Sequence, residues 1–173
     1  QIAKVYCPFE NLTMLVSLYA DGSAKKEIVA SVAEAVHADW GKADQLARLK
    51  EIFCSPTLQL CSFTITEKGY AVKDFDAEEP DAPKSVMAKV TALLYERFKA
   101  GKLPIAMVSM DNCSRNGEKL KDAVTHLAES WLRKGLVEQG FVDWLNDESV
   151  VSFPWSMIDK ITPRPDASVE KML

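Results

Sequence analysis

The order of apolar segments along the chain restricts its fold more than any other feature. Leu12 to Tyr19 is apolar and rich in β-forming residues, Asp21-Gly22 is a strong turn signal, and residues 27–32 resume a strand, which together predict a β-hairpin. Short strand-like segments then alternate with long helical ones. Strands joined through helices pair in parallel in a sheet that the helices cover. We therefore predict an α/β fold with an N-terminal β-hairpin and a mostly parallel sheet flanked by helices.

Three segments have the spacing of amphipathic helices, each with an apolar stripe and a stop signal. The expected stripes are Leu46, Leu49, Ile52 and Phe53 before Pro56; Val86, Val90, Leu93, Leu94 and Phe98 before Gly101; and Leu120, Val124, Leu127, Trp131 and Leu132 before Gly135. The strands between them are expected at 58–66, at 103–112 and from Val150 onward. The run Ile105–Val108 is apolar without alternation, which favours a strand covered on both faces.

The expected strands all end in polar segments, at residues 64–70, 109–116 and 156–163. Ligands of open parallel sheets bind at the carboxyl ends of the strands, so these segments are candidate parts of a site. The same residue types also build ordinary strand-to-helix loops. Ser114 or Asn116 could cap a helix that begins near Gly117, and Lys68-Gly69 could be a simple turn. The pattern leaves both interpretations open.

Within these segments, Asn112 is the sharpest candidate. An amide at a strand end can donate a hydrogen bond to an oxygen that becomes negative during a reaction, or it can hydrogen-bond the loop itself. Asp159 and Lys160 could orient substrate hydroxyls, or form an exposed ion pair. Tyr70 and Glu67 could contact a ribose or a nicotinamide, or only close their loop.

Several classes of function find little support in the sequence. The net charge is −4 without a basic run, which argues against nucleic acid as a partner, and no apolar stretch approaches the roughly 20 residues that span a bilayer. No signal-peptide pattern is present, so we expect a cytoplasmic protein. Only His37 and His126 could supply imidazole, and the four cysteines are scattered, so neither a metal site nor a Ser-His-Asp triad is expected. A thiol nucleophile at Cys113 would lack a neighbouring base.

None of the seven glycines has the GxGxxG spacing of a dinucleotide-binding turn. Either the chain binds no nucleotide, or it begins after that motif. Four other segments bear on this question: "SMDNCSRNG", "SFTITEKGY", "FPWSMIDKITPRP", and "NLTMLVSLYADGS" with the strand that follows it. In sequence and in order they resemble the polyol-specific long-chain dehydrogenases, which comprise the mannitol 2-dehydrogenases, fructuronate reductases and tagaturonate reductases. The resemblance covers nearly the whole chain.

The resemblance implies NAD-dependent, metal-independent interconversion of a sugar alcohol or aldonate and its keto-sugar, with NADP not excluded. Residues 1–173 would be the later part of a Rossmann-type domain. The glycine fingerprint and the helical C-terminal domain, with its catalytic lysine, would lie outside this chain. The resemblance therefore implies that the isolated chain is inactive, and that the remainder of its own polypeptide is its main partner besides a small polyol or hexuronate. Exposed sheet edges lead us to expect self-association.

Residue by residue, Asn112 matches the family's catalytic amide beside the cofactor. Asp159 matches a carboxylate of the substrate pocket, and Lys160 stands where many members have Arg. Thr66 and Glu67 match a strand end beside the cofactor. Asn116 and Gly117 match the motif, with an expected structural role. The alternative is a non-catalytic α/β interaction or assembly module that retains the family's scaffold.

Overall fold

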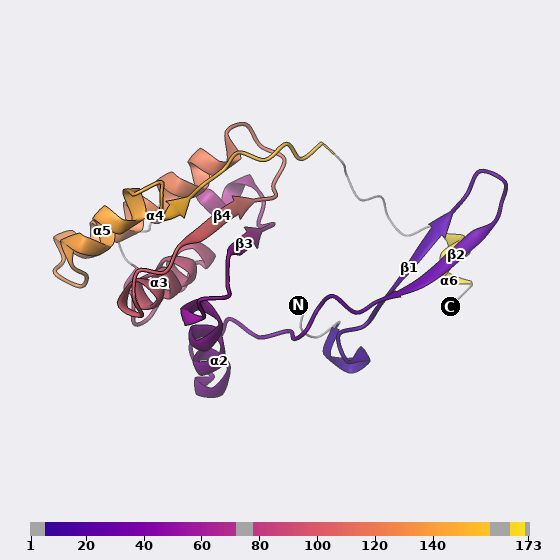
Figure 1. Cartoon of the computed structure of the whole chain (residues 1–173), viewed down its shortest axis with the longest axis horizontal. Helices are drawn as coiled ribbons and strands as arrows, with labels where there is room; N and C mark the ends of the chain where they lie inside the picture. The colour runs from indigo at the N-terminus through magenta and orange to yellow at the C-terminus, as the bar shows by residue number, and fades with distance from the viewer. Residues whose placement is uncertain (1–5, 72–77, 160–166, 172–173) are drawn as a thin grey trace. The chain divides into compact units, whose positions relative to one another are not determined.

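The computed structural model describes residues 6–71, 78–159 and 167–171, which belong to two compact units (Figure 1). The larger unit is Ala38–Asp159, and the smaller one combines the chain up to His37 with the chain from Lys160 onward. Among the described residues, no helix is long and apolar enough to cross a membrane.

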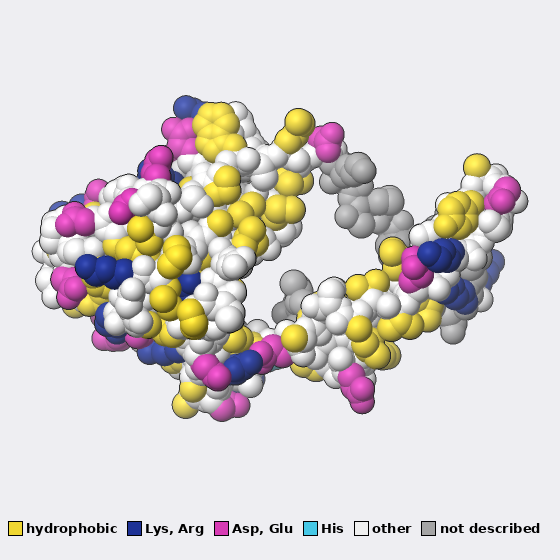
Figure 2. Space-filling view, viewed as in Figure 1, with side chains coloured by type: hydrophobic (Ala, Val, Ile, Leu, Met, Phe, Trp, Pro, Cys, Tyr) yellow, Lys and Arg dark blue, Asp and Glu magenta, His cyan; other side chains and the backbone are white. Residues whose placement is uncertain are grey.

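The smaller unit contains the predicted hairpin. Strands β1 (Thr13–Leu18) and β2 (Ala24–Val29) pair antiparallel, from Thr13↔Val29 to Leu18↔Ala24, and the turn places Gly22 at φ 84°. The prediction of a hairpin is confirmed, although β2 begins and ends three residues earlier than expected. The lysines near the start of β2 can lie within the strand because the side chains of this hairpin are largely exposed on both faces. Figure 2 shows apolar side chains on this hairpin. The exposed large apolar residues of its strands are Met14, Leu15, Leu18 and Ile28. The same unit contains the short helices η1 (Cys7–Phe9) and α6 (Ala167–Glu170).

The larger unit is built on a parallel sheet with the strand order β3-β4-β5. Strand β3 (Leu60–Phe63) pairs with β4 (Ile105–Ser109), and β4 pairs with β5 (Val151–Ser152), which confirms the predicted parallel arrangement. Burial alternates along β4: Ile105 and Met107 are buried, whereas Ala106 and Val108 are only partly buried. The expectation of cover on both faces is therefore wrong for the described residues. The lack of alternation in the sequence reflects apolar composition on both faces, of which only one is packed.

Helices α2 (Ala43–Cys54), α3 (Val86–Lys99), α4 (Asn116–Arg133) and α5 (Gln139–Asn146) accompany this sheet, with a short 3-10 helix η2 (Glu67–Tyr70) after β3. Their apolar faces and the sheet form one core, whose largest members include Trp131, Phe141, Met87 and Leu94. The predicted stripes hold for α3 and α4 with two exceptions. Val86, the first residue of α3, is half exposed, and Leu132 is only partly buried. Of the predicted stripe on α2, only Phe53 is buried.

A buried arginine cross-links the amino ends of two strands. Arg97 of α3 is fully buried, and its guanidinium donates hydrogen bonds to main-chain carbonyls alone. The acceptors are Phe53 and Ser55 (from Nη1, 2.5 and 3.0 Å), Leu58 and Pro104 (from Nη2, 2.7 and 2.6 Å) and Leu103 (from Nε, 3.0 Å). Two of these segments lead directly into β3 and β4. Arg97 therefore fixes the edge of the sheet opposite to the strands' carboxyl ends.

Candidate active site

The carboxyl ends of β3 and β4 meet at one edge of the sheet, as predicted. Phe63 and Ser109 are the last paired residues, and the N–H of Met110 still donates to the carbonyl of Phe63 at 2.7 Å. Thr66 and Asn112 each follow three residues later. The two predicted cofactor-side positions therefore leave the sheet from neighbouring strands at the same level.

Asp111 joins these two strand ends. Its carboxylate accepts hydrogen bonds from the main-chain N–H groups of Ile65 and Thr66, the closest at 2.8 Å, and from the hydroxyl of Tyr70 at 2.6 Å. Burial alone would raise the pKa of this carboxyl. The hydrogen bonds from Ile65, Tyr70 and Thr66 outweigh burial and hold the pKa below the usual 3.8. Asp111 is therefore a charged, buried cross-link between β3 and β4.

Tyr70 and Glu67 both have partners within the protein. Tyr70 is buried, and its hydroxyl also lies 2.9 Å from Oγ of Ser109. Burial, and then the hydrogen bond to Asp111, raise the pKa of Tyr70. The side chain of Glu67 is exposed and forms an ion pair with Lys119 of α4. For Tyr70, the structure favours the interpretation that it closes the loop, whereas Glu67 stays at the rim of the sheet edge.

The backbone of Thr66 is strained. Its φ and ψ are 66° and 157°, a region that a β-branched residue rarely adopts because its Cβ crowds the neighbouring carbonyl groups. The hydrogen bond from its N–H to Asp111 holds this conformation. The strand expected up to Thr66 ends at Phe63, since Asp111 takes over the N–H groups that a longer β ladder would use.

Helix α4 begins without the predicted side-chain cap. Arg115 occupies the N-cap position in the left-handed conformation (φ 52°), with no side-chain cap hydrogen bond, so neither Ser114 nor Asn116 is the N-cap residue. Asn116 is instead the first helical residue and is buried. Its Oδ1 accepts from the N–H groups of Gly117 (2.8 Å) and Ser156 (3.1 Å), and its Nδ2 lies 2.9 Å from the carbonyl of Ser156. The amide therefore binds a free N–H group at the start of α4 and also reaches across the sheet edge to Ser156.

Gly117 allows the close approach on which this pairing depends. A Cβ at this position would lie 2.5 Å from the carbonyl oxygens of both Phe153 and Pro154. Real Cβ atoms do not come so near to a main-chain oxygen, so only glycine fits here. The geometry supports the structural role expected for Asn116 and Gly117.

A pocket of about 490 Å³ lies between the two segments that Asn116 joins. Residues 111–115 form one wall and residues 155–159 the other. Asn112 and Asp159 both line the pocket and are exposed, so the structure brings these two predicted site residues together. Cys113 lines it as well, and no histidine is among its lining residues. Lys160 lies outside the described residues, and its role at the substrate stays a prediction.

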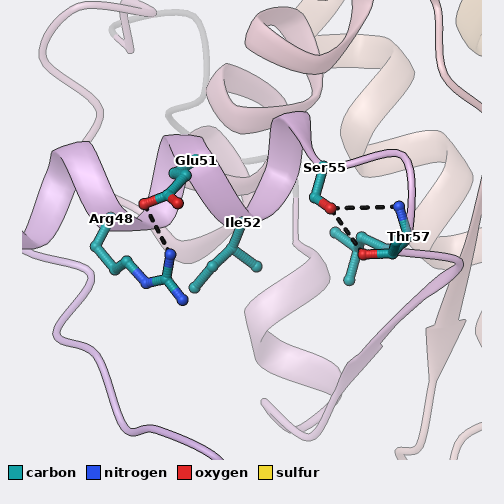
Figure 3. Close-up of a pocket in the computed structure, with 6 residues that line it drawn as sticks. Arg48, Glu51, Ile52, Ser55 and Thr57 are labelled. Atoms are coloured by element: carbon teal, nitrogen blue, oxygen red, sulfur yellow. Dashed lines mark hydrogen bonds and ion pairs between the residues drawn. The ribbon is translucent and has the colours of Figure 1, made fainter.

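A second pocket, of about 520 Å³, lies at the C-terminal end of α2 (Figure 3). Its polar side chains bind one another: Arg48 forms an ion pair with Glu51 at 2.7 Å, and the hydroxyl of Ser55 hydrogen-bonds Thr57. It adjoins the segment that enters β3, at the amino ends of the strands. Its position and its internal pairing make it a weaker candidate than the pocket of Asn112.

The sequence interpretation gave no role to Asp111, Ser109 or Ser156. Asp111 follows directly on an apolar strand, and that position is the one available signal that its carboxylate could be buried at the strand end. Ser156 acts through its main-chain N–H and carbonyl and also through its hydroxyl, which accepts from Asn116 and donates to the carbonyl of Ser109.

Comparisons with known proteins agree with the Rossmann-type fold. Residues 10–173 match the family described as the mannitol dehydrogenase Rossmann domain. The chain is 48% identical to the D-mannonate oxidoreductase of Thermotoga maritima, over 99% of this chain and 33% of that protein. It is 30% identical to the mannitol 2-dehydrogenase of Cereibacter sphaeroides, over 89% of this chain and 32% of that one. The structure of Pseudomonas fluorescens mannitol 2-dehydrogenase, in a ternary complex with NAD and D-mannitol, superposes with a TM-score of 0.75 at 25% identity, covering 99% of this chain and 35% of that one. The chain thus spans about a third of the length of these relatives.

Proposed function

Because this chain belongs to the mannitol dehydrogenase Rossmann-domain family, we propose that it forms part of an NAD-dependent oxidoreductase that interconverts a polyol or aldonate and its keto-sugar. The observation that carries the proposal is the pocket shared by Asn112 and Asp159 at the carboxyl edge of a parallel sheet. The name of the 48% identical relative places D-mannonate first among candidate substrates. D-Mannitol and D-altronate follow from the names of other relatives.

Each exposed group at the pocket has a chemical task in this proposal. Asn112 donates its amide N–H to the substrate oxygen, whose negative charge grows as the carbinol is oxidised. Asp159 accepts hydrogen bonds from substrate hydroxyls and so selects the position of the carbon chain. Holding the reacting carbon in a fixed geometry would provide much of the acceleration. The proton acceptor is a group from outside these 173 residues.

The carboxyl edge also fits one end of a nicotinamide cofactor. Thr66 and Glu67 are exposed at the end of β3, beside the strand end that bears Asn112. These three residues would contact the nicotinamide end of NAD, which would accept the hydride when bound. NADP is the alternative, and a panel of both cofactors distinguishes them.

The test compares two proteins: the 173-residue chain alone, and a polypeptide that also carries the segments its relatives add. With NAD and mannonate, mannitol or altronate, the longer protein should form NADH and the short chain should not. Asn112→Ala in the longer protein should lower kcat by roughly 10²–10³-fold, as removal of one oxyanion donor does elsewhere. Absence of turnover in the longer protein on every substrate would favour the non-catalytic module, and turnover by the short chain would refute the proposed division of labour.

Two further variants and one solution measurement complete the test. Cys113→Ser should leave turnover largely intact, whereas a thiol mechanism requires its loss. Asp159→Asn should raise KM for the polyol, with little change in cofactor affinity. The short chain should self-associate through its incompletely covered sheet, and a monodisperse monomer by light scattering would contradict this expectation.

A further inference from the structure

The segment that carries Asp159 leaves the sheet early. Strand β5 has only two residues, and its ladder with β4 ends at the pair Ala106↔Ser152. Asp159 lies seven residues further along. The structure next holds this segment at Ser156, whose N–H and carbonyl both bind the side chain of Asn116 (3.1 and 2.9 Å).

The primary amide of Asn116 is suited to this contact because it carries both an acceptor and a donor. Two N–H groups, of Gly117 and Ser156, point at one end of the amide, which identifies that end as the oxygen. The Nδ2 group has two protons, and its acceptors include the carbonyl of Ser156 on one wall and that of Asp111 on the other, at 2.9 and 3.1 Å. The Asp111 carbonyl belongs to the peptide bond that leads into Asn112. One side chain therefore binds the backbone of both pocket walls.

We propose that Asn116 is a positioning residue, which replaces the missing strand ladder beyond β5 and sets the carboxylate of Asp159 relative to the amide of Asn112. This inference rests on the proposed function for its catalytic consequence, but not for its structural one. Aspartate has the shape of asparagine without its donor. Asn116→Asp would therefore place a carboxylate against the carbonyls of Ser156 and Asp111 and weaken the attachment of residues 155–159, which the Ser156 hydroxyl also binds to the carbonyl of Ser109.

The structural part is tested on the 173-residue chain by amide hydrogen exchange and ¹⁵N relaxation. In the unmodified chain the Ser156 amide should be protected from exchange, and its exchange at the rate of an open loop would overturn the proposal without any variant. In Asn116→Asp, residues 155–159 should become mobile while the amides of β4 keep their protection. The matched control is Asn146→Asp on α5. Its amide donates to the Val142 carbonyl of its own helix (3.0 Å), so the same chemical change should leave residues 155–159 ordered. Unchanged order in Asn116→Asp would overturn the proposal.

The catalytic part is tested by a double-mutant cycle in the longer polypeptide. Asn116→Asp should lower kcat/KM for the polyol by about 10²-fold, since small misplacements of positioned groups have such effects, with cofactor affinity nearly unchanged. If Asn116 acts through Asp159, the same change should have little further effect in an Asp159→Asn background. Losses that multiply would overturn the proposal. If the unmodified longer protein oxidises no polyol or aldonate, the proposed function fails, and the exchange measurement still decides whether Asn116 holds the wall.

Discussion

Replacement of Arg97 tests how the larger unit is held together. In Arg97→Met the side chain keeps its apolar stem, but five carbonyls lose a charged donor. A hydrogen bond to a charged group contributes about 1.5–3 kcal/mol, yet bonds to one guanidinium are not independent, and water can reach part of the site. We therefore expect a loss of about 3–5 kcal/mol, the range found when one partner of a buried polar network is removed. A domain of this size is stable by about 5–15 kcal/mol, so this loss is a large share.

The assay is urea unfolding followed by circular dichroism at neutral pH. Arg97→Lys keeps the charge but has only three donors on one atom, so it should fall between the unmodified chain and Arg97→Met. Arg48→Met is the control, because its exposed ion pair with Glu51 should contribute less than about 1 kcal/mol. An unfolding midpoint for Arg97→Met at or above that of the unmodified chain would refute the reasoning. It would mean that burying the guanidinium costs more than its five hydrogen bonds return.

Three other variants test the carboxyl edge. Thr66→Gly should stabilise the chain by up to about 1 kcal/mol in urea unfolding, because the relief of strain exceeds the entropy cost of glycine; a clear loss would contradict the strain argument. Asp111→Asn should destabilise the chain by about 3 kcal/mol at neutral pH. Since the folded pKa of Asp111 lies below 3.8, this difference should be fully present above that pH and shrink as the pH falls through the lowered pKa; a pH-independent difference would count against it. Gly117→Ala should lower thermal stability by roughly 1–3 kcal/mol through its contact with Phe153 and Pro154, and no change would show that this approach relaxes freely.

The periodic parts of the fold could be predicted from the sequence because they depend on local patterns. The stripes of α3 and α4 and the turn at Asp21-Gly22 are encoded within a few neighbouring residues each. The position of Arg97 could not be predicted from such local patterns. An arginine in an amphipathic pattern is expected to face solvent, and only the fold reveals that it lies among carbonyls of the two segments 53–58 and 103–104.

The candidate site could also be predicted only in part from the sequence. Its place at the strand ends, and the pairing of Asn112 with Asp159 in one pocket, followed from topology and motif resemblance. The length of β3 and the start of α4 could not be predicted, because side chains distant in sequence compete for the same main-chain groups. Asp111 accepts from the N–H groups of Ile65 and Thr66 that a longer ladder would use, and Asn116 divides its side chain between the Gly117 N–H and Ser156.

The chemistry of Arg97 also determines how the sheet should respond to its medium. Its acceptors are carbonyl dipoles, which neither titrate nor attract counterions, so this cross-link should be insensitive to ionic strength and should persist in acid. Asp111, at the other edge, loses its charge when the solution becomes acidic enough. A pH well below 3.8 should therefore loosen the pocket edge while the amino ends of the strands stay cross-linked. In acid, the edge of the sheet that carries the titratable Asp111 should therefore lose its structure before the edge held by Arg97.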